Sequence, residues 1–239
     1  MIYDCEAYLP LTGNPYLFGE PVGGKELLDL EDEAGVRAAF TMAQGYDGSN
    51  NRTVREAVEK HPRIIGCCYV DPGKGRAAVD EFRMTVKEWG FKGLKLLLSS
   101  SDTVDELAKT ADELGVPVTI HTNGSPPMYA RIAEMAKKYP RLPIIMEHMG
   151  YRYHVDLAVE ITRRHSNLHL GTTVVAAAEP VVVKRAIQEV GAEKVLFGSN
   201  APWALPRTGV EGIKRLKLGK EDERLVLGEN FRRIFRPDR

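Results

Sequence analysis

Short apolar segments that alternate with longer helical patterns constrain the fold of this chain more than any other feature. The segments between the apolar runs place apolar residues at the spacing of an amphipathic helix, and several end in a stop signal such as Trp89-Gly90 or Leu114-Gly115. Apolar strands that alternate with helices indicate parallel strands covered by helices. Eight segments are expected to be strands: residues 1–5, 35–40, 63–70, 93–98, 116–121, 143–148, 168–172 and 194–198.

Eight repeats of a strand–helix unit predict a closed (β/α)₈ barrel, the TIM-barrel architecture of the α/β class. An open, doubly wound sheet is the alternative. A chain of 239 residues has the length of one such barrel, and no segment rich in Pro, Gly or Ser divides it. We therefore expect residues 1–239 to form a single domain.

The charge balance and the cysteines limit the partners and the compartment. Lys+Arg and Asp+Glu both count 33, so neither nucleic acid nor an anionic membrane surface is an expected partner. No apolar stretch approaches the roughly 20 residues of a membrane span, and residues 1–4 do not begin a signal peptide. Cys5, Cys67 and Cys68 are expected to be unpaired structural thiols. The expected location is the cytoplasm.

Polar side chains are concentrated where the predicted strands end. In a barrel of parallel strands the active site lies at the C-terminal strand ends and in the loops that follow them. His121 and His148 end neighbouring strands in the chain and would converge on one mouth. The other polar or aromatic residues at these ends are Asp4, Glu6, Tyr8, Tyr46, Asn50, Lys95, Asn123, Glu147, Thr172, Thr173, Ser199, Asn200 and Trp203.

Six segments resemble, in their order along the chain, the amidohydrolase superfamily. The similarity is to the amidohydrolase-related branch, which includes decarboxylases of the aminocarboxymuconate-semialdehyde type. This resemblance covers nearly the whole chain and implies a TIM barrel with metal-dependent hydrolase or decarboxylase activity on a small carboxylated substrate. The segments are 3–8 (YDCEAY), 90–95 (GFKGLK), 118–121 (VTIH), 146–150 (MEHMG), 196–202 (LFGSNAP) and 227–235 (LGENFRRIF).

The resemblance also implies site residues. Such proteins hold a divalent ion with a His-x-His pair after the first strand, a histidine after the fifth and an aspartate after the eighth. Carried over by position, Glu6 and His121 would bind one Zn²⁺ or Mn²⁺, and His148 would take part in catalysis. Tyr8 and Asn200 depart from the pattern. An amide such as Asn200 can coordinate weakly but cannot act as an acid or a base near neutral pH.

Further residues are candidates for substrate binding. Lys95 lies within an apolar strand, where a charged side chain needs a partner or a function. It is expected to bind a substrate carboxylate; carbamylation to bridge metals, or extension of the ammonium to solvent, are the alternatives. Tyr8 and Trp203 would form pocket walls, and Arg52 and Arg152 would clamp an anionic group.

The sequence leaves two other functions open. Changed residues at the ligand positions 6, 8 and 200 favour a barrel that has lost catalysis and serves as a small-molecule binding or regulatory protein. A metal-independent, lactonase-like hydrolase is a variant of the enzyme hypothesis. Because proteins of this type are usually dimers, a homodimer is also expected.

Overall fold

The computed structural model describes residues 1–10, 22–43, 49–122 and 124–237. Every pairing between its named strands is parallel, and the strands follow each other in chain order. They are β1 (Ile2–Leu9), β2 (Val36–Ala43), β3 (Ile64–Gly66), β4 (Cys68–Tyr69), β5 (Leu94–Lys95), β6 (Val118–His121), β7 (Ile144–Glu147), β8 (Leu168–Gly171) and β9 (Val195–Leu196).

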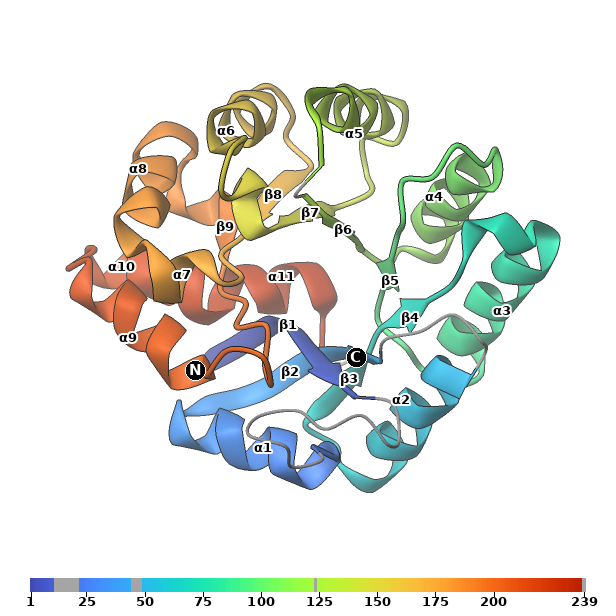
Figure 1. Ribbon diagram of the computed structural model, residues 1–239, viewed down its shortest axis with the longest axis horizontal. Coiled ribbons are helices and arrows are strands. Elements are labelled where there is room, and N and C mark those ends of the chain that lie inside the picture. Colours follow the sequence, from blue (N-terminus) through green and yellow to red (C-terminus); the bar gives the residue numbers. More distant parts are fainter. Residues whose placement is uncertain (11–21, 44–48, 123, 238–239) are drawn as a thin grey trace.

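Backbone hydrogen bonds join these strands into a ring. β3 and β4 belong to one chain segment interrupted at Cys67, whose N–H still donates to the carbonyl of Thr41 on β2 (2.9 Å). At the other end of the order, the N–H of Cys5 donates to the carbonyl of Phe197 (2.9 Å) and the N–H of Tyr8 to that of Ala201 (2.8 Å). The segment that follows β9 therefore lies beside β1, and the strands occupy the centre of Figure 1.

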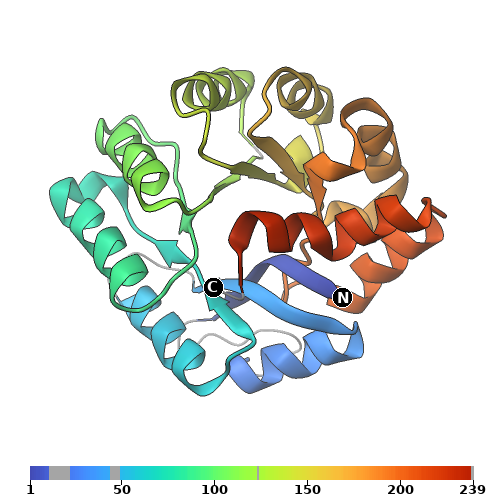
Figure 2. The same ribbon diagram turned by 180° about the vertical axis from the view of Figure 1, so that it is seen from behind.

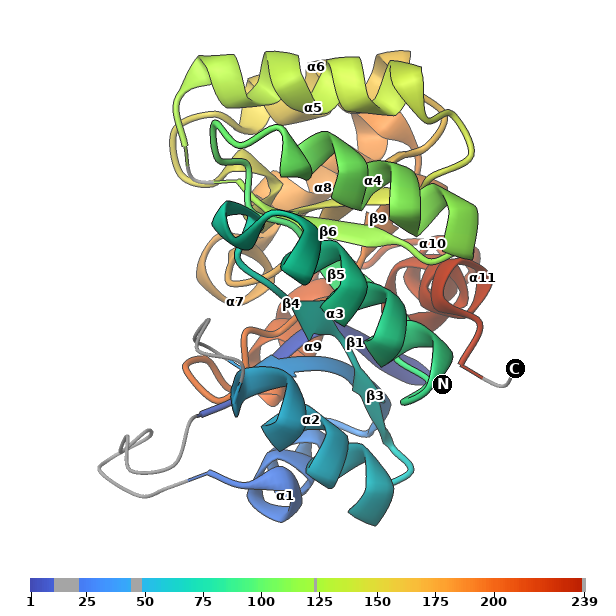
Figure 3. The same ribbon diagram turned by 90° about the vertical axis from the view of Figure 1, so that its right-hand side faces the viewer.

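Helices surround the strands on the outside (Figure 1), and the side view shows α3 and α4 alongside β4, β5 and β6 (Figure 3). Apolar residues at helical spacing bury one face of each long helix against the sheet, which is why these segments fold as amphipathic helices. The α-helices are α1 (Gly24–Glu33), α2 (Ser49–Lys60), α3 (Arg76–Lys87), α4 (Thr103–Leu114), α5 (Pro126–Lys138), α6 (Val155–Arg164), α7 (Val175–Ala178), α8 (Pro180–Val190), α9 (Pro206–Arg215), α10 (Lys220–Arg224) and α11 (Asn230–Phe235).

One end of the ring is covered by the C-terminal helix α11. Seen from behind, α11 lies across the strands (Figure 2). Its Phe231 stacks on Tyr3 with ring centroids 5.1 Å apart, and Phe235 contacts Phe40 at 4.5 Å. These rings join the inner core of the barrel, which also contains buried Ile145. This end holds apolar packing, which leaves the C-terminal strand ends for chemistry.

The predicted (β/α)₈ barrel is confirmed, with differences in strand length. The first strand extends to Leu9 and so includes Glu6 and Tyr8. The segment 93–98 keeps ladder pairing only at Leu94 and Lys95. The three cysteines are buried and free, as predicted. Within the described residues, none of the helices is both long and apolar enough to span a bilayer.

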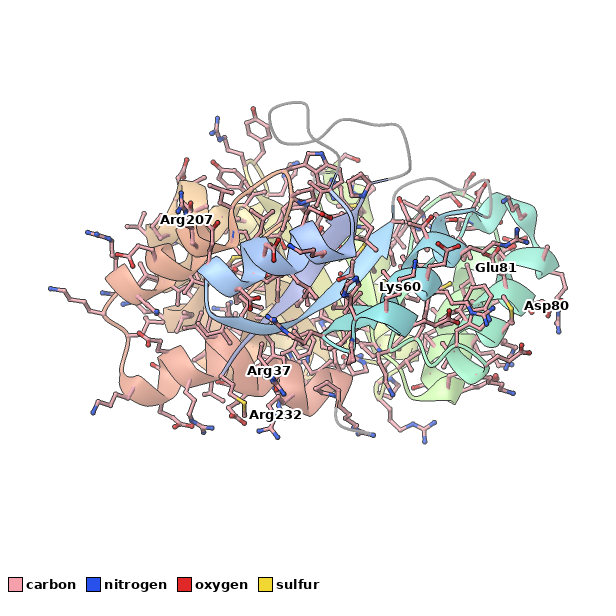
Figure 4. All side chains as sticks on the ribbon, turned by 90° about the horizontal axis from the view of Figure 1, so that it is seen from below. Arg37, Lys60, Asp80, Glu81, Arg207 and Arg232 are labelled. Atoms are coloured by element: carbon pink, nitrogen blue, oxygen red, sulfur yellow. The ribbon has the colours of Figure 1, made fainter. Side chains whose placement is uncertain are left out.

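Charged side chains gather on the outer helices. Lys60 and Asp80, labelled in Figure 4, lie on α2 and α3 and are exposed. Arg207 of α9, also labelled, forms an ion pair with exposed Glu33 of α1 (3.4 Å). Such exposed pairs contribute little to stability.

Two carboxyl groups are buried where α1 packs on the sheet. Asp4 and Glu31 are both fully buried. The Oδ1 of Asp4 accepts the N–H groups of Glu6 and Ser199 (both 2.9 Å), but within the described residues no other donor reaches its Oδ2 or the carboxyl oxygens of Glu31. Burial raises the pKa of Asp4 to about 6. Burial, and then the charge of Asp4, raises the pKa of Glu31 well above its usual value. The pair is therefore expected to share a proton.

Glu31→Gln should make the protein more stable at pH 8. The pKa of Asp4 is raised from 3.8 to about 6 and that of Glu31 is raised well above its usual value, so both groups favour folding at low pH and this contribution is lost as the pH rises through their folded-state pKa values. The variant leaves the single negative charge on Asp4 and gives it an amide donor that, unlike the shared proton, is not lost at high pH. Its free energy of unfolding in urea should exceed that of the wild type at pH 8 by about 1–3 kcal/mol, the cost of leaving a buried polar group unsatisfied, and by less at pH 5.

Glu33→Gln on the same helix is the matched control, because Glu33 is exposed, and its urea curves should follow the wild type at both pH values. A Glu31→Gln protein that is less stable than the wild type at pH 8 would contradict the shared proton.

Candidate active site

The C-terminal ends of three neighbouring strands bring their side chains into the mouth of the barrel. Lys95 ends β5, His121 ends β6 and Glu147 ends β7, and the ladder pairs His121 with Glu147 directly. Lys95 is paired with Thr119, two residues before His121, so these side chains share the inward face of the sheet. The positions of these groups therefore follow from strand register rather than from loop conformation.

A buried ammonium lies at the centre of the site. The Nζ of Lys95, which is 3% exposed, donates to the Oε2 of Glu147 and to the hydroxyl of Tyr8 (2.8 Å). It also lies 3.6 Å from the Oε1 of Glu6. Thr119 donates to the other oxygen of Glu147 (2.7 Å). One lysine thus contacts two carboxylates that are themselves fully buried.

Glu6 is held from both sides. The hydroxyl of Tyr8 donates to its Oε1 (2.6 Å), and that of Thr173 donates to its Oε2 (2.5 Å). The ladder between β1 and β2 is irregular between Asp4 and Ala7, and such an irregularity re-aims side chains. A Cβ atom on Gly198 would lie 2.7 Å from the Oγ1 of Thr173, so glycine is needed for this close approach.

The two predicted histidines meet beside Glu147. The Nε2 of His148 lies 2.9 Å from the Nδ1 of His121, and that Nδ1 lies 3.6 Å from the Oε2 of Glu147. The other ring nitrogen of His148, Nδ1, is 3.3 Å from the carbonyl of Thr173. His121, Glu147 and His148 each offer a ligand atom, and these atoms lie within 4.8 Å of one another.

The electrostatics follow from this burial and pairing. Burial opposes the charge of Glu147, but the ammonium of Lys95 and then the neighbouring His121 outweigh it and lower the pKa of the carboxyl. Burial also opposes the charge of Lys95, and here Glu147 and Glu6 outweigh it and raise the pKa. Burial, followed by the charge of Glu6, raises the pKa of Tyr8 well above its usual value. At neutral pH, Glu147 is therefore a carboxylate, Lys95 an ammonium and Tyr8 a neutral phenol.

Left-handed backbone conformations surround the site. His148 and Met149 follow β7 with φ of 61° and 54°, Val174 follows β8 with 65°, and Asn200 follows β9 with 71°. Positive φ is unfavourable for residues other than glycine, above all for a β-branched valine, at a cost of roughly 1–3 kcal/mol each. The structure accepts this strain at three successive strand ends, which is typical of functional sites.

A pocket of about 380 Å³ opens next to the histidine pair. Trp203, 38% exposed, contacts Tyr8 edge to face with ring centroids 4.7 Å apart. Asn200 is half-buried in the same lining. The pocket is lined by Tyr8, Tyr69, Lys95, Leu97, His121, His148, Asn200 and Trp203.

The structure brings most of the predicted site residues together but not the arginines. Arg52 on α2 and Arg152 are exposed and do not line this pocket. Arg152 instead donates to the hydroxyl of Tyr151 (3.0 Å). Tyr46 and Asn123, two further polar strand-end residues, lie outside the described residues.

Glu147 and Thr173 are predicted to lie at strand ends, but the sequence assigns neither of them a role in the site. Glu147 carries a detectable signal, because a carboxylate that closes an apolar strand directly before His148 needs a buried cation. Thr173 has no such signal in the sequence, because its contact with Glu6 joins residues that are 167 positions apart.

The sequence model of the amidohydrolase family matches residues 19–236, and the chain belongs to this family. This confirms the resemblance and the enzyme type that the sequence predicted. No curated protein matches the chain.

Solved structures agree on the fold. The 2,6-dihydroxybenzoate decarboxylase from Rhizobium is 17% identical with a TM-score of 0.75, and the match covers 100% of this chain and 99% of that one. The 5-carboxyvanillate decarboxylase from Novosphingobium aromaticivorans, solved with manganese and 4-hydroxy-3-methoxy-5-nitrobenzoic acid, is 16% identical with a TM-score of 0.78 over 99% and 96%. A probable 2-pyrone-4,6-dicarboxylic acid hydrolase from Acinetobacter baumannii, with citric acid bound, is 15% identical with a TM-score of 0.73 over 98% of both chains.

Tyr8→Phe should destabilise the protein by about 1–3 kcal/mol, because it removes the hydroxyl that bonds buried Glu6 and accepts from Lys95. Urea unfolding at pH 7 measures the change. Tyr153→Phe is the control, because Tyr153 is 85% exposed and its substitution should have no measurable effect. Equal stability of the Tyr8→Phe variant and the wild type would show that the buried hydroxyl is dispensable.

Proposed function

We propose that this chain is a metal-dependent enzyme of the amidohydrolase type that decarboxylates or hydrolyses a small, planar carboxylated substrate. The observation that carries the proposal is the group of His121, Glu147 and His148, whose ligand atoms converge beside a pocket with aromatic walls. Solved structures of the same fold that hold manganese together with 2-nitroresorcinol or with 4-hydroxy-3-methoxy-5-nitrobenzoic acid support the same class of reaction.

The three residues fit a divalent ion. Ligand atoms about 2.0–2.1 Å from one Zn²⁺ in a tetrahedral site lie about 3.3 Å apart. The Nδ1 of His121 lies 2.9 Å from the Nε2 of His148 and 3.6 Å from the Oε2 of Glu147. The carbonyl of Thr173 accepts from the Nδ1–H of His148, a contact that leaves Nε2 free to bind a metal. Imidazole and carboxylate ligands suit Zn²⁺ or Mn²⁺.

We propose a role for Glu6 other than the metal ligand that the resemblance implied. Its oxygens accept from Tyr8 and Thr173, and Lys95 lies beside it, so we assign Glu6 to the lysine rather than to the ion. The site then contains two carboxylates and one ammonium, with a net charge of minus one. A bound divalent ion would turn this into plus one, which attracts a carboxylate substrate.

The pocket favours a flat substrate. Tyr8, Tyr69 and Trp203 present aromatic surfaces, and Leu97 adds an aliphatic one. Aromatic faces and edges bind planar rings well, and their apolar area excludes water. A small aromatic or otherwise unsaturated carboxylate therefore suits the pocket.

Each residue has a proposed task. The ion, when bound, would act as a Lewis acid on a substrate oxygen. Asn200 can orient the substrate through its amide but cannot carry a proton near neutral pH. If the ion is held by the Nδ1 of His121 and the Nε2 of His148, and the Nδ1–H of His148 donates to Thr173, the ring nitrogen of this pair that is left for proton transfer is the Nε2 of His121.

Asn200 also favours a second function. Without a carboxylate at this position, the barrel can retain its pocket and lose turnover, as expected for a binding or regulatory protein. Tight binding of aromatic carboxylates without turnover would support that function. Turnover that survives chelation would instead support the metal-independent, lactonase-like hydrolase.

Three further properties are part of the proposal. We propose that residues 1–239 act as one domain, because the family match spans 19–236. We propose the cytoplasm as the location, because three buried free thiols suit a reducing compartment. The homodimer stays a prediction.

His148→Asn should lose metal and turnover together. If His148 is a ligand, the affinity for Zn²⁺ or Mn²⁺ should fall by at least about 100-fold, more than the loss of an outer-shell partner costs. Metal content after dialysis and calorimetric titration measure the change. His165→Asn, away from the pocket, is the control. A His148→Asn protein that keeps its ion and loses only turnover would assign proton transfer alone to this residue.

Trp203→Ala should weaken binding of aromatic carboxylates, because it removes an aromatic contact of about 0.5–1.5 kcal/mol. The Kd or KM should rise roughly 2- to 12-fold across a panel of hydroxybenzoates, with metal content unchanged. Tyr153→Ala should leave both quantities unaltered. Equal affinity of the Trp203→Ala variant and the wild type for the whole panel would place the substrate elsewhere.

A further inference from the structure

Lys95 is the one residue of the pocket lining whose charged group lies between two buried carboxylates. We propose that its ammonium is a built-in cation that fills the place between Glu6 and Glu147 and thereby limits the active site to a single divalent ion. The count of ions rests on the proposed metal site, whereas the role of the lysine does not.

The contacts of Lys95 are those of a bound cation. Its Nζ touches oxygen atoms from three side chains: Glu147 by a hydrogen bond, Tyr8 at 2.8 Å and Glu6 at 3.6 Å. The Oε2 of Glu147 faces both Lys95 and the Nδ1 of His121 (3.6 Å). Glu147 therefore bridges the ammonium and the proposed metal position, as a carboxylate does between two cations.

Charge balance explains why a cation must be there. Glu6, Glu147 and Lys95 are at most 3% exposed, and a buried ion without a partner costs several kcal/mol. Without the ammonium, two carboxylates would face each other across the barrel. The ammonium of Lys95 is a permanent part of the chain, so one positive charge stays beside Glu6 and Glu147 even when no metal ion is bound.

The same contacts argue against the two other roles considered for Lys95. Tyr8 and Glu147 accept two of the three N–H donors of the ammonium, and Glu6 lies at an ion-pair distance of 3.6 Å, so two protein carboxylates already neutralise the charge that a substrate carboxylate would need. Carbamylation would replace the cation by an anion and place three negative groups together. That arrangement would be stable only with two bound ions.

Replacing Lys95 by an uncharged side chain should open the second cation position. In Lys95→Met, the oxygens of Glu6, Glu147 and Tyr8 would form an oxygen-rich site next to the histidine pair, and such sites suit Mn²⁺. We expect the bound Mn²⁺ to rise from one ion per chain in the wild type to two in the variant. Elemental analysis after dialysis and calorimetric titration measure the number. The melting temperature of the variant should also rise on addition of Mn²⁺ by more than that of the wild type.

Two further variants make the result specific. Lys87→Met removes an exposed lysine of α3 and should keep one ion. Lys95→Met combined with Glu6→Gln should return to one ion, because it removes a carboxylate of the opened position. A Lys95→Met protein that folds and binds no more Mn²⁺ than the wild type would overturn the inference.

The outcome also separates this inference from the proposed function. A wild-type protein without any bound ion would contradict the metal-dependent function. A gain of one ion on Lys95→Met would, even then, support the built-in cation.

If Lys95→Met does not fold, the wild type itself provides the test. NMR of protein labelled with ¹⁵N-lysine should show a protected ammonium signal that is absent from Lys95→Arg. This signal should persist after addition of Zn²⁺ and bicarbonate. Loss of the signal under these conditions would indicate carbamylation and overturn the inference.

Discussion

The buried contact between Lys95 and the carboxylates of Glu6 and Glu147 is the interaction on which the rest of the site depends. Each carboxylate has further donors, Thr173 and Tyr8 for Glu6 and Thr119 for Glu147, so the charges are fixed in place as well as paired. Because burial makes any unpaired charge costly, these groups can occupy only one arrangement. The histidine pair is positioned beside this arrangement through Glu147, and the aromatic wall through Tyr8.

The barrel could be predicted from the sequence because its signal is local. Apolar runs and helical spacing are repeated along the chain, and each repeat indicates its own element. The meeting of His121 and His148 could be predicted for a related reason, since both end parallel strands, and parallel strand ends meet at one edge. Strand lengths were harder to predict, because ladder pairing at residues 93–98 depends on neighbours distant in sequence.

The remainder of the site depends on contacts that the sequence pattern does not contain. The irregularity in β1 that directs Glu6, the left-handed conformations at His148, Val174 and Asn200, and the contact of Thr173 with Glu6 are consequences of tertiary packing. Arg152 illustrates the opposite case: its position after a strand suggested a substrate clamp, and in the structure its guanidinium packs on Tyr151. A position near a strand end places a residue at the mouth without setting its direction.

His121 and Glu147 are paired in the strand ladder, so two of the proposed metal ligands belong to the sheet and not to the loops. The groups proposed to hold the ion sit on or directly after hydrogen-bonded strands, whereas Asn200 and Trp203, which line the pocket, belong to the segment after β9. Mutation of that segment can therefore change what the pocket accepts without moving the ion. A barrel built this way can acquire new substrates over evolutionary time while its inorganic chemistry stays the same, and the same separation offers a practical starting point for redesign.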